Sequence, residues 1–150
     1  MPSKKPIICF HSTVGQIQLH NRNILKDFIA FIFRTEGTLL HELHYVFCSD
    51  AYLLQINQQY LNHDTYTDII TFNLSEPFKP VLSDIYISVD RVRENAMLLQ
   101  TTFKLELHRV IFHGALHLCG LKDKSKKEKE LMRLKEDYYL DRYFVPRETI

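Results

Sequence analysis

Two histidines and an aspartate in the stretch HGALHLCGLKD, residues 113–123, have the types and spacing of a metal site. His113 and His117 are four residues apart, so on a helix they project from one face with Cβ atoms about 6 Å apart. Two imidazoles placed in this way can hold one ion. Gly120 follows where such a helix would end, and its access to a left-handed conformation lets the chain turn back so that Asp123 reaches the same ion.

This ligand set predicts a catalytic zinc site. Three protein ligands leave the fourth tetrahedral position of zinc open for a water, which would be the nucleophile. Asp123 leaves the ion with less positive charge than a third imidazole would, so its water should be less acidic. A zinc peptidase of the HExxH type has a glutamate base immediately after the first histidine, where this chain has Gly114. Peptide hydrolysis by that route is therefore disfavoured.

The same residues also have simpler interpretations. Histidine pairs with this spacing occur on helices by chance, although the ordered set that continues to Gly120 and Asp123 is more specific. Asp68 and Asp84 lie in or beside predicted strands, where carboxylates are scarce. They are either strand-end residues or carboxylates of the metal pocket, and Thr67 is a further pocket candidate.

A dense group of lysines follows the metal motif: Lys122, Lys124, Lys126, Lys127 and Lys129. The glutamates among them are typical of a solvated helix face. Beside a metal cation, the lysines instead predict contact with a phosphate-bearing substrate. Cys119 should point away from the histidine face into the core. The other histidines are isolated along the sequence, and we assign no role to His11, His20, His41, His44, His63 or His108.

The composition is that of an ordinary globular protein. A chain of 150 residues is long enough for one domain with a single core. Its net charge of +1 argues against a protein that coats nucleic acid through bulk charge. The three cysteines are widely spaced and form no CxxC pair, which argues against a disulfide scaffold or a cysteine-rich zinc site and favours a reducing cytoplasm. We expect no signal peptide and no membrane span, because no apolar run is long enough.

Periodicity and capping residues predict the elements that position these side chains. Strands are expected over residues 6–11, 38–48, 68–74 and 82–89, with residues 15–19 as a further partner of the first. Helices are expected over residues 23–35, 51–61, 90–119 with a break near residues 101 and 102, and 126–144. Asn23 and the pair Ser49-Asp50 are the predicted N-caps of the first two helices, and Ser125 with Glu128 has the form of a capping box.

This order of elements predicts an α+β fold. The expected architecture is a single domain over residues 1–150, with a small mixed β-sheet packed with helices and a metal-binding helix that ends in a glycine turn. The chain has no repeat, low-complexity tract or linker. Many functions share such folds, so the function must be argued from the site.

Three stretches in order along the chain resemble the YbeY-type endoribonucleases, also called ribosomal RNA maturation factors. The family signature HGxLHLxGxxH corresponds to HGALHLCGLKD, the segment LNxxYR with TDVLSF to INQQYLNHDTYTDIITF, and LGDIxIS to LSDIYIS. The resemblance covers most of residues 45–123, and Gly114 is part of the family pattern. It implies one zinc ion bound by His113, His117 and Asp123, and work in small-subunit ribosomal RNA 3′-end maturation and ribosome quality control. Ribosomal RNA and ribosomal subunits would be the partners.

Two positions depart from the family pattern. Asp123 stands where the pattern most often has histidine, which keeps a metal ligand but lowers the charge of the site. Leu61 follows Tyr60 where the pattern has an arginine linked to RNA cleavage. Leucine cannot hold a phosphate or stabilise a developing charge. Either another cation, such as one of the lysines of residues 122–129, takes that part, or cleavage is weak.

Three functions therefore stay open. The first is a metal-dependent endoribonuclease in ribosomal RNA processing. The second is a ribosome-associated binding factor with a structural ion, which both departures from the pattern favour. The third is a zinc hydrolase on another substrate, which would need a base such as Asp68, Asp84 or Glu106 because Gly114 supplies none.

Overall fold

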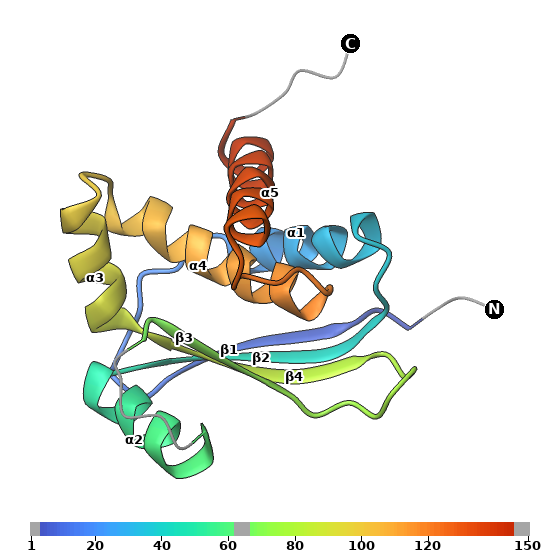
Figure 1. Cartoon of the computed structure of the whole chain (residues 1–150), viewed down its shortest axis with the longest axis horizontal. Helices are drawn as coiled ribbons and strands as arrows, with labels where there is room; N and C mark the ends of the chain where they lie inside the picture. Colours follow the sequence, from blue (N-terminus) through green and yellow to red (C-terminus); the bar gives the residue numbers. More distant parts are fainter. Residues whose placement is uncertain (1–3, 62–66, 146–150) are drawn as a thin grey trace.

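The computed structural model describes residues 4–61 and 67–145 of the chain. Within these residues, four strands form one mixed sheet and five helices pack around it (Figure 1). This arrangement confirms the predicted α+β fold.

The sheet is built from the four main predicted strands. They are β1 (Ile7–Ser12), β2 (Leu40–Cys48), β3 (Ile69–Asn73) and β4 (Val81–Ser88). Their order in the sheet is β1-β2-β4-β3, in which β1, β2 and β4 run parallel and β3 pairs antiparallel with β4. Strands separated by helices in the sequence thus become neighbours in the sheet.

The helices also follow the predicted pattern. They are α1 (Arg22–Thr35), α2 (Asp50–Leu61), α3 (Val89–Leu98), α4 (Phe103–Leu118) and α5 (Lys126–Phe144). The break between α3 and α4 lies where it was expected, and the Thr102 hydroxyl caps α4 by accepting a hydrogen bond from the Leu105 amide. Ser125 and Glu128 form the predicted capping box of α5. No helix in the described part of the chain combines the length and the apolar character that crossing a membrane would require.

Two local predictions are wrong, one in the segment before α1 and one at the start of α1. Residues 15–19 form no strand, although Ile17 and Leu19 are buried at alternate positions. The two side chains enter the core from an irregular segment in which the Leu19 amide bonds to the Ile17 carbonyl, so a period of two arises without pairing. The N-cap of α1 is Asn21 and not Asn23; Asn21 is left-handed and its side chain makes no capping hydrogen bond.

The two faces of the sheet have different coverings. Figure 1 shows α1, α4 and α5 over one face and α2 against the other. Because side chains alternate along a strand, Tyr45 and Ile85 face the three-helix side, where the Tyr45 hydroxyl donates to the Ile111 carbonyl of α4 at 2.9 Å. Tyr86, one residue further along β4, stacks with Tyr52 of α2. The side on which a strand residue lies therefore decides whether it can reach α4.

Candidate functional site

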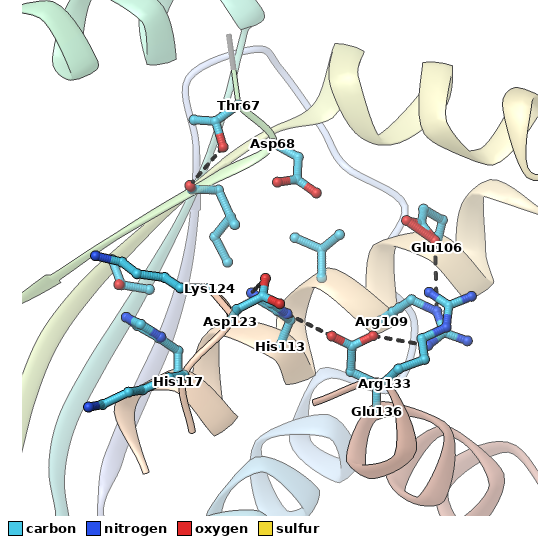
Figure 2. A pocket seen from close by; sticks show the side chains of 14 residues that line it. Thr67, Asp68, Glu106, Arg109, His113, His117, Asp123, Lys124, Arg133 and Glu136 are labelled. Atoms are coloured by element: carbon cyan, nitrogen blue, oxygen red, sulfur yellow. Dashed lines mark hydrogen bonds and ion pairs between the residues drawn. The ribbon is translucent and has the colours of Figure 1, made fainter. Parts of the chain in front are cut away.

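A cavity of about 670 Å³ opens between α4, α5, β3 and the loop that joins α4 to α5. Figure 2 shows its polar side chains, which come from all four of these segments. His113, His117 and Asp123 all line it, as do Asp68 and Thr67. The structure therefore brings the three predicted metal ligands to one pocket.

One face of α4 supplies four of the polar residues that line the cavity. Glu106, Arg109, His113 and His117 follow one another at spacings of three, four and four residues, so they lie in one row along the helix. Arg109 was not among the residues predicted for the site. Arg109 lies four residues before His113, and this helical spacing is the signal in the sequence that would have identified it.

The chain turns back after α4 as the glycine predicted. Gly120 has a φ of 100°, which is left-handed, and its amide bonds to the His117 carbonyl at 3.0 Å. The Leu121 amide bonds to the Leu116 carbonyl at 3.1 Å, which completes a Schellman motif. This turn returns the chain to the pocket and places Asp123 Oδ2 3.7 Å from His113 Nε2.

A hydrogen bond from Nδ1 orients each of the two imidazoles. His113 Nδ1 donates to Glu136 Oε2 at 2.6 Å, and His117 Nδ1 donates to the Leu121 carbonyl at 3.2 Å. Each contact leaves the Nε2 lone pair available, which is the usual arrangement behind a metal-ligating histidine. Burial lowers the pKa of His113, but Glu136, Asp123 and Asp68 outweigh it and raise that pKa above its ordinary value.

The three predicted ligands do not yet converge to bonding geometry. Ligand atoms of a tetrahedral zinc lie about 3.4 Å apart, given zinc–nitrogen and zinc–oxygen bonds near 2.1 Å, so His113 and Asp123 are within a few tenths of an ångström. His117 is exposed and lies further out along the wall. It has to move inward if all three are to hold one ion.

Half-buried Asp68 and buried Glu106 complete the acidic part of the pocket. Burial raises the pKa of Asp68, although the nearby His113 opposes the effect. Burial likewise raises the pKa of Glu106, and one of its oxygens has no hydrogen-bond partner among the described residues. The hydroxyl of Thr67 donates to the Ile69 carbonyl at 3.3 Å. Asp68 and Glu106 are thus the pocket carboxyls available for proton transfer.

Asp84 does not line this pocket. It lies two residues before Tyr86 on β4, so its side chain projects toward the α2 side of the sheet, while Ile85 between them faces α4. Of the strand carboxylates named from the sequence, the pocket therefore contains Asp68 alone.

The predicted basic residues divide between the pocket and the start of α5. Lys122 and Lys124 line the cavity, whereas Lys126 and Lys127 lie in the first turn of α5 and do not. Leu61 ends α2, and its side chain lies outside those that the structure describes.

Two arginines that the sequence analysis did not identify also line the cavity. Arg109 links α4 to α5 through Glu136 at 3.0 Å and Asp137 at 2.7 Å. Within the described residues, the Arg133 guanidinium forms no hydrogen bond or ion pair, and the residue is exposed. Arg133 is therefore the arginine of the pocket most available for a phosphate.

Gly114 lies where α4 packs closely against the sheet. A Cβ at this position would lie 3.0 Å from the Cδ1 atoms of both Ile69 and Ile85. A side chain at residue 114 would therefore point into the apolar contact with β3 and β4. The position that carries the base in an HExxH peptidase thus faces away from the polar pocket in this fold.

Another group of metal-ligating side chains lies elsewhere in the fold. Cys9, His11 and His44 bring one potential ligand atom each to within 4.8 Å of one another, and no other group of three in the described residues does so. No role was predicted for His11 and His44, because they are isolated along the sequence. His63 lies outside the described residues.

Comparisons with known proteins agree with one another. The family model described as Endoribonuclease YbeY matches residues 8–144. A protein of that name from Cytophaga hutchinsonii is 51% identical over 134 residues, which are 89% of this chain and 94% of the relative. One from Porphyromonas gingivalis is 49% identical over 129 residues, which are 86% and 83% of the two chains. The solution structure of TM1509 from Thermotoga maritima, at 26% identity, aligns with a TM-score of 0.61 and covers 92% of this chain and 89% of its own.

Proposed function

Because the chain belongs to the endoribonuclease YbeY family, we propose that it is a metal-dependent endoribonuclease that acts in ribosomal RNA processing. Its task would be 3′-end maturation of small-subunit ribosomal RNA and ribosome quality control. Ribosomal RNA and ribosomal subunits would be its partners, in the cytoplasm. The observation that carries the proposal is the pocket itself, in which His113 and Asp123 approach to 3.7 Å beside His117.

The proposed cofactor is one zinc ion held by His113, His117 and Asp123. The donor set suits zinc, because both imidazoles present an Nε2 lone pair and the carboxylate supplies a negative charge. His117 is exposed, so its side chain can move inward without disturbing the core. When bound, zinc would supply a Lewis acid for the phosphodiester and would acidify the attacking water.

We assign the proton transfer of the reaction to Asp68. Its carboxyl interacts with the charges of His113 and Asp123, so it lies close to the proposed metal ligands. Burial raises its pKa, which brings a carboxyl nearer to the range in which it can both take up and release a proton. Glu106 lies in the same cavity and has the same tendency, but it also faces Arg109, which opposes the rise.

The phosphate groups of RNA would be held by cations of the pocket rim. Arg133 comes from α5 and Lys122 and Lys124 come from the loop after α4, and all three line the cavity together with the metal residues. A guanidinium can bind a phosphate through two parallel hydrogen bonds. Arg133 would therefore bind the RNA phosphate, which the leucine at position 61 cannot do.

One observation favours the second candidate, a ribosome-associated binding factor. The three metal residues do not converge within 4.8 Å, unlike another cluster of the same chain. A factor of this kind would bind ribosomal RNA through the basic rim without cleaving it. The two functions share the pocket and differ in a single property, the cleavage of RNA.

The test compares wild type with His117→Ala and with a matched control, His20→Ala. His20 is also exposed and lies outside the cavity. The endoribonuclease function predicts that His117→Ala loses bound zinc and cleavage of a structured RNA carrying the small-subunit 3′ end, while His20→Ala retains both. Binding of that RNA by all three proteins without cleavage by any of them would support the binding factor.

A further inference from the structure

A Cys-His-His cluster lies on the face of the sheet opposite the pocket. Cys9 and His11 are alternate residues of β1, and Cys9 is the direct partner of His44 on β2. Phe10 and Tyr45 stack on each other and point to the three-helix side, so their neighbours point away from it. Strand register therefore holds the three side chains together, on a surface that α4 and α5 do not reach.

The distances in this cluster are close to those of a metal site. His11 Nε2 and His44 Nδ1 are 2.9 Å apart, where one nitrogen donates a hydrogen bond to the other. Two nitrogens on a tetrahedral zinc lie about 3.3 Å apart, and a nitrogen and a sulfur about 3.6 Å. The three ligand atoms already lie within 4.8 Å of one another. Small rotations of these side chains would let a metal ion replace the proton that His11 and His44 share.

A carboxylate behind the cluster selects the ligand atom of one histidine. His44 Nε2 donates to Glu42 Oε2 at 2.7 Å, and both residues lie on the same face of β2. This contact fixes the tautomer in which the lone pair is on His44 Nδ1, the atom that faces His11. Metal-ligating histidines are commonly held by a carboxylate in this way. The orientation is thus independent support for a ligand role.

We propose that Cys9, His11 and His44 form a second metal site that binds a transition-metal ion of the zinc class. One thiolate and two imidazoles select zinc, cobalt or copper over magnesium and calcium, which prefer oxygen ligands. Glu42 and Asp84, the β4 partner of His44, add negative charge on the same face of the sheet. His11 is exposed, so the fourth position is open to solvent. The ion would also fasten the edge strand β1 to β2.

Cobalt(II) is a direct probe, because a cobalt–thiolate bond gives a charge-transfer absorption in the near ultraviolet that nitrogen and oxygen ligands do not give. Titration of metal-free protein should produce this band with saturation at one thiolate-bound ion per chain. Cys9→Ser should abolish the band, and His11→Ala should weaken it. Glu42→Gln should lower the cobalt affinity of this site about 10–100-fold.

The matched control is Cys119→Ser, which should leave the band unchanged. Cys119 lies at the end of α4 and packs against the hydrophobic core, so it is not part of the cluster on β1 and β2. His113→Ala should also keep the band, because the proposed pocket ligands include no thiol. Loss of RNA cleavage therefore leaves this proposal intact, and loss of the band leaves the pocket proposal intact.

Circular dichroism shows whether Cys9→Ser is folded. If it folds poorly, His11→Ala carries the test, because His11 is exposed. A folded wild-type protein that shows no thiolate band with cobalt overturns the second site. So does a band that persists in folded Cys9→Ser, or one that is unaffected by His11→Ala.

Discussion

Replacing Glu136 with glutamine removes the charge behind His113 while it keeps the size of the side chain. Glu136 is buried on α5, where Oε2 accepts from His113 Nδ1 at 2.6 Å and Oε1 accepts from Arg109 Nη1 at 3.0 Å. Loss of a carboxylate behind a metal-ligating histidine typically weakens metal binding about 10–100-fold. A hydrogen bond to a charged group is worth about 1.5–3 kcal/mol, which corresponds to the same range. We therefore expect the zinc Kd of Glu136→Gln to rise about 10–100-fold.

The assay is a competition titration of zinc against a chelator of known affinity, at fixed pH and with the Cys9→Ser background to remove the other cluster. Asp137→Asn is the matched control, because Asp137 also binds Arg109 at 2.7 Å but makes no contact with His113. Its zinc Kd should stay within about twofold of the parent. An equal loss of affinity in both variants would show that the link between α4 and α5 matters and that the orientation of His113 does not. An unchanged Kd in Glu136→Gln would refute the reasoning outright.

Three further predictions address packing, titration and substrate binding. Gly114→Ala should lower the free energy of unfolding by about 1 kcal/mol in urea denaturation, because crowding of Ile69 and Ile85 at 3.0 Å exceeds the gain in helix propensity; a more stable variant would contradict this. Asp68→Asn should stabilise the metal-free protein at pH 7 and lose this advantage below pH 4. The reason is that a carboxyl whose pKa is raised in the folded state lowers stability only when it is ionised. Equal stabilisation at both pH values would contradict this prediction. Arg133→Ala should lower RNA affinity and reduce the salt slope of binding by about 0.7–0.9, the contribution of one phosphate contact, with no change in thermal stability.

Local rules were sufficient for the features that lie within a few residues of one another. The spacing of His113 and His117, the left-handed turn at Gly120 and the capping box at Ser125 depend on helix geometry alone, and all three elements form as expected. The alternation of Ile17 and Leu19 followed the same type of rule and failed, because burial at every second residue does not require a paired strand.

The missed parts of the structure join residues that are far apart in the sequence. Glu136 reaches His113 only because α5 packs across α4, and no pattern within either helix reveals that pairing. The cluster of Cys9, His11 and His44 depends on the register between β1 and β2. Sequence patterns gave the side of a strand or helix on which a residue lies, whereas these contacts needed the position of one element against another.

The most direct test of the central claim is the cleavage of a structured small-subunit ribosomal RNA 3′ end by protein stripped of metal and then reloaded with zinc. Wild type should lose cleavage when the metal is removed and regain it with zinc. His113→Ala should show no recovery, and the Cys9→Ser variant should recover like wild type. Cleavage that persists in stripped protein or in reloaded His113→Ala would contradict an endoribonuclease that depends on a metal in this pocket.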